Sequence, residues 1–336
     1  MSKHCEILEI EGLHVSFQDG HSSVTALRDV GFTIQKGKTL ALVGESGSGK
    51  SVTSLAIMGL LPNNARIESR RMRFYPVADG DALDLDRLKP KTMRELRGRR
   101  IAMIFQEPMS SLNPLYSIGD QIGEMLLLHE GLDASARKNR VIEILELVEI
   151  PSAAQRYNAW PHEFSGGMRQ RVMIALALVC KPSLLIADEP TTALDVTIQA
   201  QILDLMRRLQ SELEMSILFI THDMGVVAEM ADDVAVMYAG QIVERTDTRK
   251  LFSAPRHPYT QGLLASIPRH GRARNQRIVP IPGSVPSLRA MPPGCSFAPR
   301  CSFSETQCRV ESIDLLEPAH GHLSRCIRMD KVPANG

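Results

Sequence analysis

The stretch that most constrains this chain is a glycine-rich segment at residues 44–51, which reads GESGSGKS. It follows Leu40–Val43, an apolar run short enough for a buried strand, and leads into Ser51–Leu61, whose apolar positions suit a helix. The pattern G-x-x-x-x-G-K-[ST] between a strand and a helix is typical of phosphate-binding loops, because glycines let successive backbone N–H groups face an anion. Lys50 can then reach the β- and γ-phosphates of a nucleotide, and the Ser51 hydroxyl can bind Mg²⁺. The predicted nucleotide-binding residues of this loop are Gly44, Glu45, Ser46, Gly47, Ser48, Gly49, Lys50 and Ser51.

Strands and helices alternate around this loop, which predicts an α/β fold with parallel strands. Leu184–Ala187 and Ile217–Ile220 are further candidates for buried strands. The helix-like stretches beside them are Gly166–Val179 and Gln199–Leu213. Before the loop, short strands separated by polar turns are expected at Ile7–Ile10, Leu13–Phe17 and Gly31–Ile34. Residues 107–163 carry mainly helical patterns, such as Ala134–Val148, and are predicted to form an inserted α-helical subdomain.

Proline and cysteine divide the chain unequally. A length of 336 residues suggests about two domains. From Leu251 to the end, the chain holds 11 of its 20 prolines and four of its six cysteines. Because proline fixes φ and removes a hydrogen-bond donor, this part cannot be mostly regular helix or central strand. The predicted domains are a compact α/β unit at 1–250 and a small, irregular C-terminal domain at 251–336.

The charge balance and hydropathy argue against a general nucleic-acid binder and against a membrane-spanning protein. The chain has 39 Lys and Arg against 38 Asp and Glu, a balance that argues against a general nucleic-acid binder. Its longest uncharged apolar run, Val172–Cys180, is far shorter than the ~20 residues of a membrane-spanning helix. Acidic residues lie near the N-terminus, where a signal peptide would need its apolar core. The sequence therefore predicts a cytoplasmic protein.

Two acids follow the apolar strand at 184–187, in the sequence LLIADEP. Asp188 is placed to bind Mg²⁺ at the carboxyl end of the strand, and Glu189 is placed to polarise an attacking water. One acid for the metal and one for water is the arrangement that hydrolysis of a phosphoanhydride requires. After a phosphate-binding loop, this reading outweighs a solvated acidic turn.

A second anion site is predicted at residues 164–171, which read FSGGMRQR. Ser165, Gly166 and Gly167 lie at the start of a helix, where unpaired N–H groups favour an anion, although an ordinary serine N-cap has the same pattern. The segment resembles the LSGGQ signature of ABC-type ATPases. It departs from that signature in having Phe164 for Leu and Met168 for Gln.

Other motifs of the same family occur in order along the chain. Gln106 in AMIFQEP resembles the Q-loop, Asp195 in TALD the D-loop, and His222 in FITHD the switch histidine. The resemblance implies that Gln106 contributes to Mg²⁺ binding and that Phe17 stacks on adenine. It also implies that hydrolysis of ATP depends on Glu189, His222, Gln106 and Lys50. The implied fold is an ABC-type P-loop ATPase core, a mixed sheet with helices, carrying the inserted helical subdomain and the small C-terminal domain.

The family resemblance also implies partners. In ABC ATPases, two domains close head to tail around two ATP, so that Ser165, Gly166 and Gly167 would serve the nucleotide held by a partner. Asp195 is a further nucleotide-binding candidate. The C-terminal segments at 256–268, 281–288 and 294–301 resemble the bacterial peptide-importer ATPases, which include dipeptide, oligopeptide, nickel and glutathione systems. That resemblance implies a second, related ATPase subunit, with a heterodimer favoured over a homodimer. It further implies two integral permease subunits, an extracytoplasmic solute-binding protein, and a peripheral location at the cytoplasmic face of the inner membrane.

A soluble ABC ATPase that acts on nucleic acid or ribosomes is the alternative. Proteins of that kind usually carry long coiled-coil arms, zinc modules or tandem ATPase domains, and none is visible in this sequence. The balanced charge also disfavours a nucleic-acid partner, although the basic stretch RELRGRR at 94–100 keeps the alternative open.

The C-terminal cysteines are candidates for a metal site. Cys295, Cys301, Cys308 and Cys326 have five, six and 17 residues between them, without the C-x₂-C pairs of most structural zinc sites. Four thiolates suit a soft metal, which would also stabilise a poorly patterned domain. By resemblance to some peptide-importer ATPases, a [4Fe–4S] cluster is favoured, with zinc and free thiols as the alternatives. Cys5 and Cys180 are expected to be buried and unrelated to this group.

Overall fold

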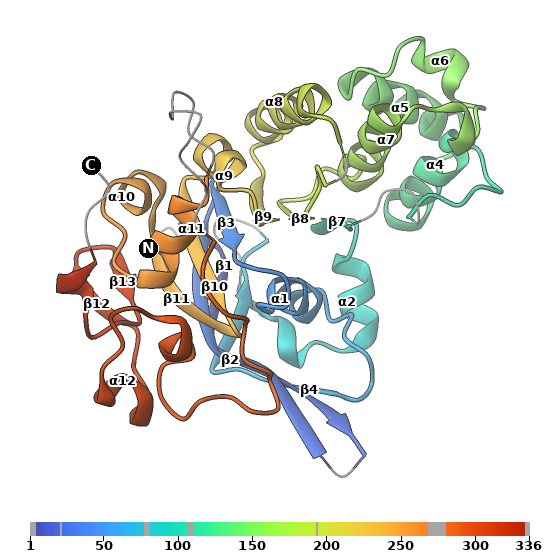
Figure 1. Ribbon diagram of the computed structural model, residues 1–336. Coiled ribbons are helices and arrows are strands. Elements are labelled where there is room, and N and C mark those ends of the chain that lie inside the picture. The colour runs from blue at the N-terminus through green and yellow to red at the C-terminus, as the bar shows by residue number, and fades with distance from the viewer. Residues whose placement is uncertain are drawn as a thin grey trace. The chain divides into compact units, whose positions relative to one another are not determined.

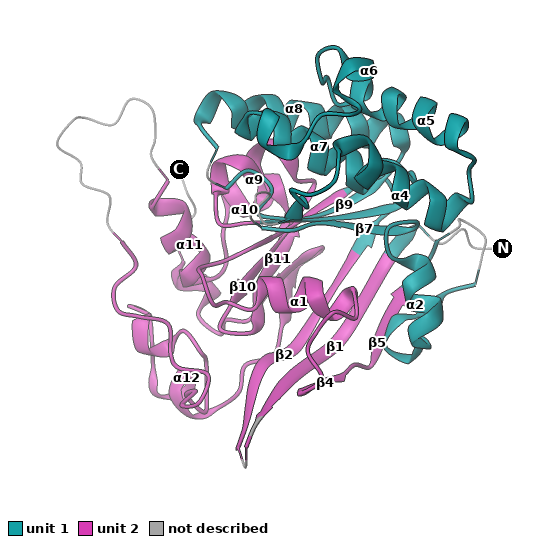
Figure 2. Ribbon diagram, turned by 90° about the vertical axis from the view of Figure 1, so that its right-hand side faces the viewer, with its two compact units in different colours: residues 1–7, 34–38, 74–220 teal, residues 8–33, 39–73, 221–336 magenta. Residues whose placement is uncertain are grey.

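A computed structural model describes residues 5–20, 22–76, 81–106, 111–192, 194–267 and 280–332. The chain forms two compact units (Figure 2). Unit 1 consists of residues 1–7, 34–38 and 74–220, and unit 2 consists of residues 8–33, 39–73 and 221–336.

Three parallel strands form the centre of unit 1. They are β7 (Ile101–Ile104), β8 (Leu184–Asp188) and β9 (Ser216–Thr221), and β8 pairs in parallel with both neighbours. Every residue of the three is buried. Continuous runs of branched apolar residues are expected of such strands, because both faces of a parallel sheet are covered. Among the expected strands, those at 184–187 and 217–220 are confirmed.

The helices of unit 1 lie mainly between β7 and β9 in the sequence (Figure 1). They are α2 (Pro90–Leu96), α4 (Ile118–Glu130), α5 (Ala134–Leu147), α6 (Ala153–Arg156), α7 (Gly166–Leu178) and α8 (Val196–Leu213). Shorter elements of the unit are β6 (Leu83–Asp84) and the 3-10 helices Leu85–Arg87 and Pro161–Glu163. Side chains cap α4, α5, α7 and α8. In α4, for example, Ser117 accepts a hydrogen bond from the Asp120 N–H, and in α5 Asp133 accepts one from the Ala136 N–H.

The segment predicted as a helical subdomain is helical where it is described. Residues 111–163 contain α4, α5, α6 and the 3-10 helix Pro161–Glu163, and this part of the chain contains no strand. The first four residues of the predicted subdomain, 107–110, lie outside the described residues.

Unit 2 contains a sheet in which β1 (Glu6–Asp19) lies between β2 (Ser22–Gln35) and β5 (Arg71–Phe74), while β4 (Ala65–Glu68) also pairs with β1. The expected short strands at 7–10, 13–17 and 31–34 therefore belong to two strands of 14 residues each. The acidic residues of β1 do not end the strand, because they form ion pairs with arginines. Glu9 contacts Arg71 at 3.1 Å, and Glu11 contacts Arg70 at 3.2 Å.

The second set of strands in unit 2 follows the order β12–β13–β11–β10–β3. Their bounds are β3 (Thr39–Val43), β10 (Asp233–Tyr238), β11 (Gln241–Asp247), β12 (Leu316–Ala319) and β13 (His322–Ser324). The strand β10 is parallel to β3 and antiparallel to β11. The helices are α1 (Lys50–Ile57), α9 (Met224–Met230), α10 (Thr248–Ser253), α11 (Pro258–Ala265) and α12 (Thr306–Val310), with 3-10 helices at Ala298–Arg300 and Met329–Lys331. The first helix ends four residues before the expected Leu61, because Gly59 turns the chain with a φ of +59°.

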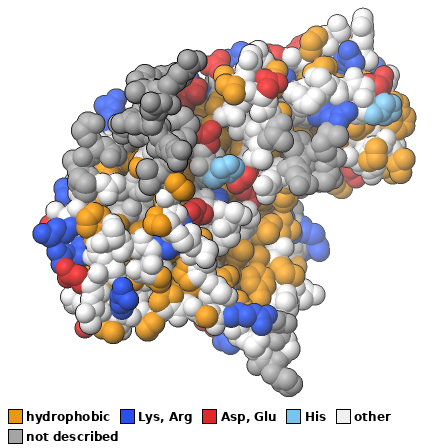
Figure 3. Space-filling model, in the orientation of Figure 1, with side chains coloured by type: hydrophobic (Ala, Val, Ile, Leu, Met, Phe, Trp, Pro, Cys, Tyr) orange, Lys and Arg blue, Asp and Glu red, His pale blue; other side chains and the backbone are white. Residues whose placement is uncertain are grey.

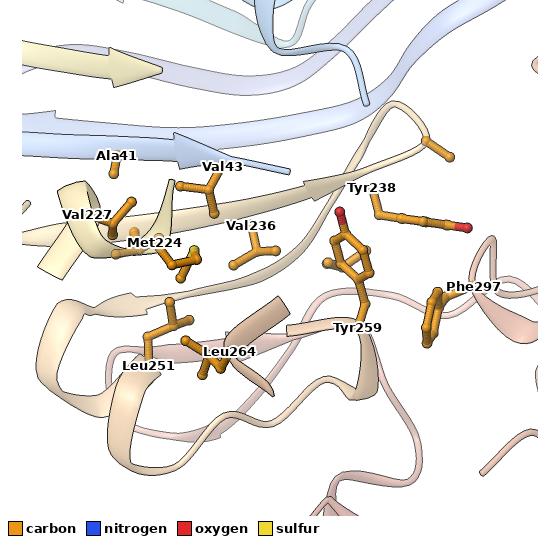
Figure 4. Close-up of a cluster of buried hydrophobic side chains, with 13 residues drawn as sticks. Ala41, Val43, Met224, Val227, Val236, Tyr238, Leu251, Tyr259, Leu264 and Phe297 are labelled. Carbon is orange, nitrogen blue, oxygen red and sulfur yellow. The ribbon is translucent and has the colours of Figure 1, made fainter. Parts of the chain in front are cut away.

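An aromatic core joins β10 to the C-terminal region within unit 2 (Figure 4). The ring centroid of Tyr238 lies 4.6 Å from that of Tyr259 and 5.3 Å from that of Phe297. Leu251 and Leu264 belong to the same buried cluster. The C-terminal region thus packs against β3, which leads into the phosphate-binding loop, and against its neighbour β10.

A buried carboxylate also fixes the C-terminal region. The side chain of Glu244 on β11 is fully buried and accepts hydrogen bonds from the backbone N–H groups of Arg256 and His257. Its Oε1 lies 2.7 Å from His322 Nε2 on β13. Because a buried charge is stable only with such partners, Glu244 ties the chain before α11 and the strand β13 to one point of β11.

Candidate functional site

The phosphate-binding loop connects β3 to α1 and depends on glycine at defined positions. Gly47 and Gly49 have φ values of +76° and +106°, in the left-handed region that favours glycine. A Cβ on Gly44 would lie 2.2 Å from the carbonyl oxygen of Met237, so that no side chain fits there. Gly49 is the N-cap residue of α1 and provides no side-chain acceptor, so no side chain caps the end of the helix that favours an anion.

Lys50 lies inside this loop rather than in solvent. Its side chain is buried, and Nζ donates to the carbonyl oxygens of Gly44 and Glu45 at 2.8 and 3.1 Å. The hydroxyl of Ser48 is also buried and has no protein hydrogen-bond partner among the described residues, whereas Ser51 is exposed at the start of α1. A helix N-terminus without a side-chain cap, a buried ammonium and a buried hydroxyl fit the phosphates of a nucleotide.

The two predicted carboxylates, Asp188 and Glu189, lie at the end of β8 in unit 1. Asp188 is the last residue of the strand and is buried, and Glu189 follows it with a φ of +48°. A left-handed backbone at a residue other than glycine costs on the order of 1–3 kcal/mol and often occurs at functional sites. The Glu189 N–H donates to the carbonyl of Ile220 at 2.9 Å, which holds the turned backbone in place.

The structure brings Gln106 and Glu189 together. Gln106 follows β7, and its Nε2 donates to Glu189 Oε2 at 3.0 Å. The hydroxyl of Thr192 donates to the same oxygen at 3.0 Å. The sequence analysis included Thr192 only as the first residue of TALD and gave it no role of its own. The carboxylate of Glu189 is therefore oriented by two donors in unit 1.

The start of α7 and the start of α8 lie next to each other. Ser165 caps α7, since its Oγ accepts from the Met168 N–H at 3.3 Å, and both Ser165 and Gly166 are exposed. A Cβ on Gly167 would lie 2.9 Å from Ile198 Cγ2. Asp195 caps α8 by accepting from the N–H of the same Ile198 at 2.9 Å. The predicted signature and D-loop residues thus both lie against Ile198, through its side chain and its backbone N–H respectively, although Ala193 of the D-loop lies outside the described residues.

Phe164, which replaces the usual leucine of the signature, is almost fully buried. The guanidinium of Arg156 lies 5.5 Å from its ring centroid. An aromatic residue therefore fills an apolar position at this site without disturbing the exposed serine and glycine that follow it.

The remaining predicted residues belong to unit 2. His222 directly follows β9 and is exposed, while the next residue, Asp223, caps α9 by accepting from the Gly225 N–H at 2.8 Å. Phe17 lies on β1 opposite Ala65 of β4 and is half-buried, so that part of its ring is accessible. These residues and the phosphate-binding loop lie in unit 2, whereas Gln106, Asp188, Glu189, Asp195 and residues 165–167 lie in unit 1.

The four C-terminal cysteines line one small cavity of about 20 Å³. Burial raises the pKa of Cys326 to about 12 and also raises the pKa of Cys295 and Cys301. Without a metal, these thiols are therefore protonated at neutral pH. Cys180 is buried as expected, but Cys5 is exposed, because it precedes the first strand.

The donor type and shared cavity of these cysteines agree with a soft-metal site, but their present arrangement does not form one. Among the residues that the structure describes, no group of three or more His, Cys, Asp or Glu side chains is placed to hold a metal ion.

Comparison with known proteins agrees with this geometry. Residues 27–192 match the family model of ABC transporters, and residues 243–308 match that of the oligopeptide/dipeptide transporter C-terminal region. A putative peptide import ATP-binding protein of Brucella ovis is 51% identical over 333 residues, which is 98% of each chain. The dipeptide transport ATP-binding protein of Escherichia coli is 46% identical and aligns over 95% of this chain and 96% of its own.

Two solved structures have the same core. A dimeric ATP-binding cassette in a post-hydrolysis state, bound to ADP and Pi, matches with a TM-score of 0.61 and 25% identity over 72% of this chain and 99% of its own. A subunit of an ABC transporter complex from Clostridium perfringens also matches with a TM-score of 0.61, at 27% identity over 74% of this chain and 91% of its own.

The fold and the loop define a P-loop ATPase of the ATP-binding cassette class. The chain belongs to the ABC transporter family, as an ATP-binding subunit whose ATPase activity is coupled to transport, and its full-length relatives are peptide-import ATP-binding proteins. Within the described residues, the structure contains no helix with both the length and the apolar character to span a bilayer.

Proposed function

We propose that this chain hydrolyses ATP to power import of peptides or related small solutes through a membrane ABC transporter. The observation that carries the proposal is the carboxylate of Glu189, which Gln106 and Thr192 orient one residue beyond the buried Asp188. A matching C-terminal region at 243–308 supports the peptide class.

In this proposal, the sequence motifs give each predicted site residue a role. The backbone N–H groups of the loop other than those of Glu45 and Ser48, which have protein acceptors, bind the phosphates together with the Lys50 ammonium, and Phe17 stacks on the adenine. By their motifs, Ser51, Gln106 and Asp188 would hold Mg²⁺, which would neutralise phosphate charge. Glu189 accepts the proton of the attacking water, and His222 contacts the γ-phosphate.

A partner ATPase completes the active unit in this proposal. The exposed N-terminus of α7, with Ser165, Gly166 and Gly167, binds the nucleotide held by the partner, and Asp195 caps the neighbouring helix α8. Exposure of Ser165 and Gly166 supports this role, since an anion outside the chain can reach them. We favour a heterodimer with a related subunit, and closure of the pair would accompany ATP binding.

In this proposal, the helical subdomain of the ATPase domain contacts the permease. Residues 1–250 form the ATPase domain with its helical subdomain at 107–163, and residues 251–336 form the C-terminal domain. Four exposed apolar residues of the helical subdomain, on α4 and before it, are candidates for contact with the permease: Leu115, Tyr116, Leu127 and Leu128. A groove of about 710 Å³, lined by residues that include Tyr116, Gln121 and Met125, lies beside them. Hydrophobic side chains also gather at the right-hand edge of Figure 3, where Figure 1 places α4.

Purification from membranes tests this assignment. The full chain, tagged and extracted in mild detergent, should retain two integral permease subunits and a second ATPase. The chain should then be located at the cytoplasmic face of the inner membrane, and the permease subunits of the complex should receive solute from an extracytoplasmic binding protein. Recovery of ribosomes or DNA in place of permease subunits would support the alternative of a soluble ABC ATPase.

We further propose that Cys295, Cys301, Cys308 and Cys326 hold a [4Fe–4S] cluster. Their gathering at one cavity and their thiol chemistry support this proposal, with zinc and free thiols as the alternatives. Anaerobic purification should give a coloured protein with about four iron atoms per chain. A colourless, iron-free and fully folded protein would reject the cluster, and a stoichiometric zinc content would favour zinc.

A further inference from the structure

Arg300 in the C-terminal region forms a two-pronged ion pair with the phosphate-binding loop. Its Nη1 lies 2.7 Å from Glu45 Oε2, and its Nη2 lies 3.1 Å from Glu45 Oε1. Only 4% of the Arg300 side chain and 29% of the Glu45 side chain are exposed. A paired fork of this kind fixes both the position and the orientation of the carboxylate.

The guanidinium of Arg300 is held on its other sides as well. Its Nε donates to the carbonyl of Pro282 at 2.8 Å, and Nη2 donates to the carbonyl of Ile281 at 3.3 Å. The rings of Tyr238 and Phe297 lie 5.8 and 5.9 Å from its Cζ. These contacts fix the guanidinium independently of the loop, so that Arg300 can hold the Glu45 side chain in place.

A second contact holds the backbone of the same glutamate. The Glu45 N–H donates to the hydroxyl of Tyr259 at 2.9 Å, and Tyr259 is fully buried on α11 against Tyr238 and Phe297 (Figure 4). The carbonyl of Glu45 in turn accepts from Lys50 Nζ at 3.1 Å. One residue therefore links the C-terminal region to the lysine that is placed to bind phosphate.

We propose that Arg300 and Tyr259 are positioning residues for ATP, which hold and neutralise Glu45 so that a triphosphate can bind the loop. This inference rests on the proposed role of residues 44–51 as the nucleotide site. A carboxylate in that loop would repel the phosphates if it were free. Arg300 compensates its charge and holds it against the C-terminal region, and Tyr259 fixes the backbone conformation in which the loop N–H groups remain available.

If Arg300 compensates the charge of Glu45, variants of this pair should differ in ATP affinity in a specific way. Arg300→Met leaves the Glu45 carboxylate uncompensated, so the KM and Kd for ATP should rise about tenfold, while kcat stays within about twofold because Glu189 and Gln106 are untouched. Adding Glu45→Gln to Arg300→Met removes that charge and should restore most of the affinity. Tyr259→Phe removes only the hydroxyl and should raise the Kd about threefold.

The experiment titrates the full chain with a fluorescent ATP analogue and Mg²⁺ and measures ATP hydrolysis in the transporter complex. Arg309→Met is the matched control, because Arg309 is exposed on α12 in the same region. Lys50→Ala separates the two proposals: normal binding by that variant would reject the nucleotide loop itself. If Lys50→Ala loses binding while Arg300→Met binds ATP as tightly as Arg309→Met, the role of Arg300 is wrong.

A purely structural role for Arg300 gives a different pattern. The double variant would then bind ATP no better than Arg300→Met and would unfold at the same lowered temperature, which would overturn the charge argument. Arg300→Lys keeps the charge without the fork and provides a folded variant if Arg300→Met is unstable. It should bind ATP more weakly than the unaltered chain, and unchanged binding and kinetics would again contradict the proposal.

Discussion

At the scale of single residues, the site depends on backbone conformations that few side chains tolerate. Gly44 lies against the Met237 carbonyl, and Glu189 adopts a left-handed φ although it has a side chain. Sequence alone predicted both residues, since the loop and the acidic pair are short local patterns. It could not predict the Thr192 hydroxyl or the Tyr259 hydroxyl as partners, because those contacts depend on how the chain folds back.

Replacing the proposed base should separate binding from hydrolysis. Glu189→Gln keeps the shape of the side chain but removes the proton acceptor, so kcat should fall by roughly 10²–10⁴-fold while ATP binding is retained. Steady-state hydrolysis and equilibrium titration on the same preparation measure the two effects. Glu95→Gln, at an exposed position of α2, is the control. Hydrolysis at the normal rate by Glu189→Gln would mean that another group activates water.

Steric exclusion at Gly44 gives a second prediction. Gly44→Ala places a Cβ 2.2 Å from a backbone oxygen, so the loop must move, and we expect at least tenfold weaker ATP binding. Gly131→Ala is the comparison, because it has a φ of +66° but no atom within 4 Å of the added Cβ. It should cost only about 1 kcal/mol of stability and leave ATP binding unchanged. Equal affinities for the two variants would contradict the close contact at Gly44.

At the scale of elements, sequence patterns did not predict what stabilises the C-terminal region. Its many prolines and weak periodicity predicted an irregular domain that needs some other stabilising group. The structure supplies a buried carboxylate and an aromatic cluster, which join residues far apart in the chain and leave no local signal. Conversely, two short strands were predicted at 7–10 and 13–17, but Glu11 and Gly12 between them continue one strand, β1.

The buried Glu244 should account for much of the stability of this region. Glu244→Ala leaves the N–H groups of Arg256 and His257 and the His322 ring without their acceptor, so the free energy of unfolding should fall by about 3–5 kcal/mol. Urea unfolding measures the change. Glu311→Ala, at an exposed position, should change it by less than about 0.5 kcal/mol. A loss for Glu244→Ala no larger than that of Glu311→Ala would contradict this account.

The N-cap of α11 makes stability depend on pH. Burial lowers the pKa of His257 to about 3, and the Arg325 guanidinium acts in the same direction. The unfolded chain takes up a proton near pH 6.5, whereas the folded chain does not until about pH 3, so stability falls as the pH drops through that window. The loss from this residue between pH 7 and pH 5 is about 2 kcal/mol.

His257→Asn tests this dependence while keeping a side-chain acceptor for the Tyr259 N–H. Urea unfolding at pH 7 and pH 5 should show a pH dependence reduced by about 2 kcal/mol in this variant. His162→Asn, at an exposed position, should behave like the unaltered chain. A variant at His257 with the full pH dependence would show that other groups take up the proton.

At the scale of the whole molecule, the chain is one part of a larger assembly. Family motifs predicted the ATPase core and the class of transporter, because they are continuous in sequence. The surface that contacts the permease has no such motif, since exposure is a property of the folded chain. Leu128, which is 68% exposed on α4, is a residue that only the structure could select.

A charge on that surface should weaken assembly without affecting the nucleotide site. Leu128→Asp should reduce the amount of permease that co-purifies by at least about tenfold, because an aspartate would be desolvated in an apolar contact. ATP affinity of the isolated chain should not change. Val310→Asp, which is 60% exposed on α12, should co-purify normally. Undiminished recovery with Leu128→Asp would place the permease contact elsewhere.

The most direct test measures peptide uptake and phosphate release together in vesicles that contain the complete importer. With the unaltered chain, both should require ATP, Mg²⁺ and the peptide-loaded binding protein. With Glu189→Gln, both should fall to background although the vesicles still bind ATP. Uptake at the normal rate with Glu189→Gln would contradict the claim that ATP hydrolysis at this site powers import.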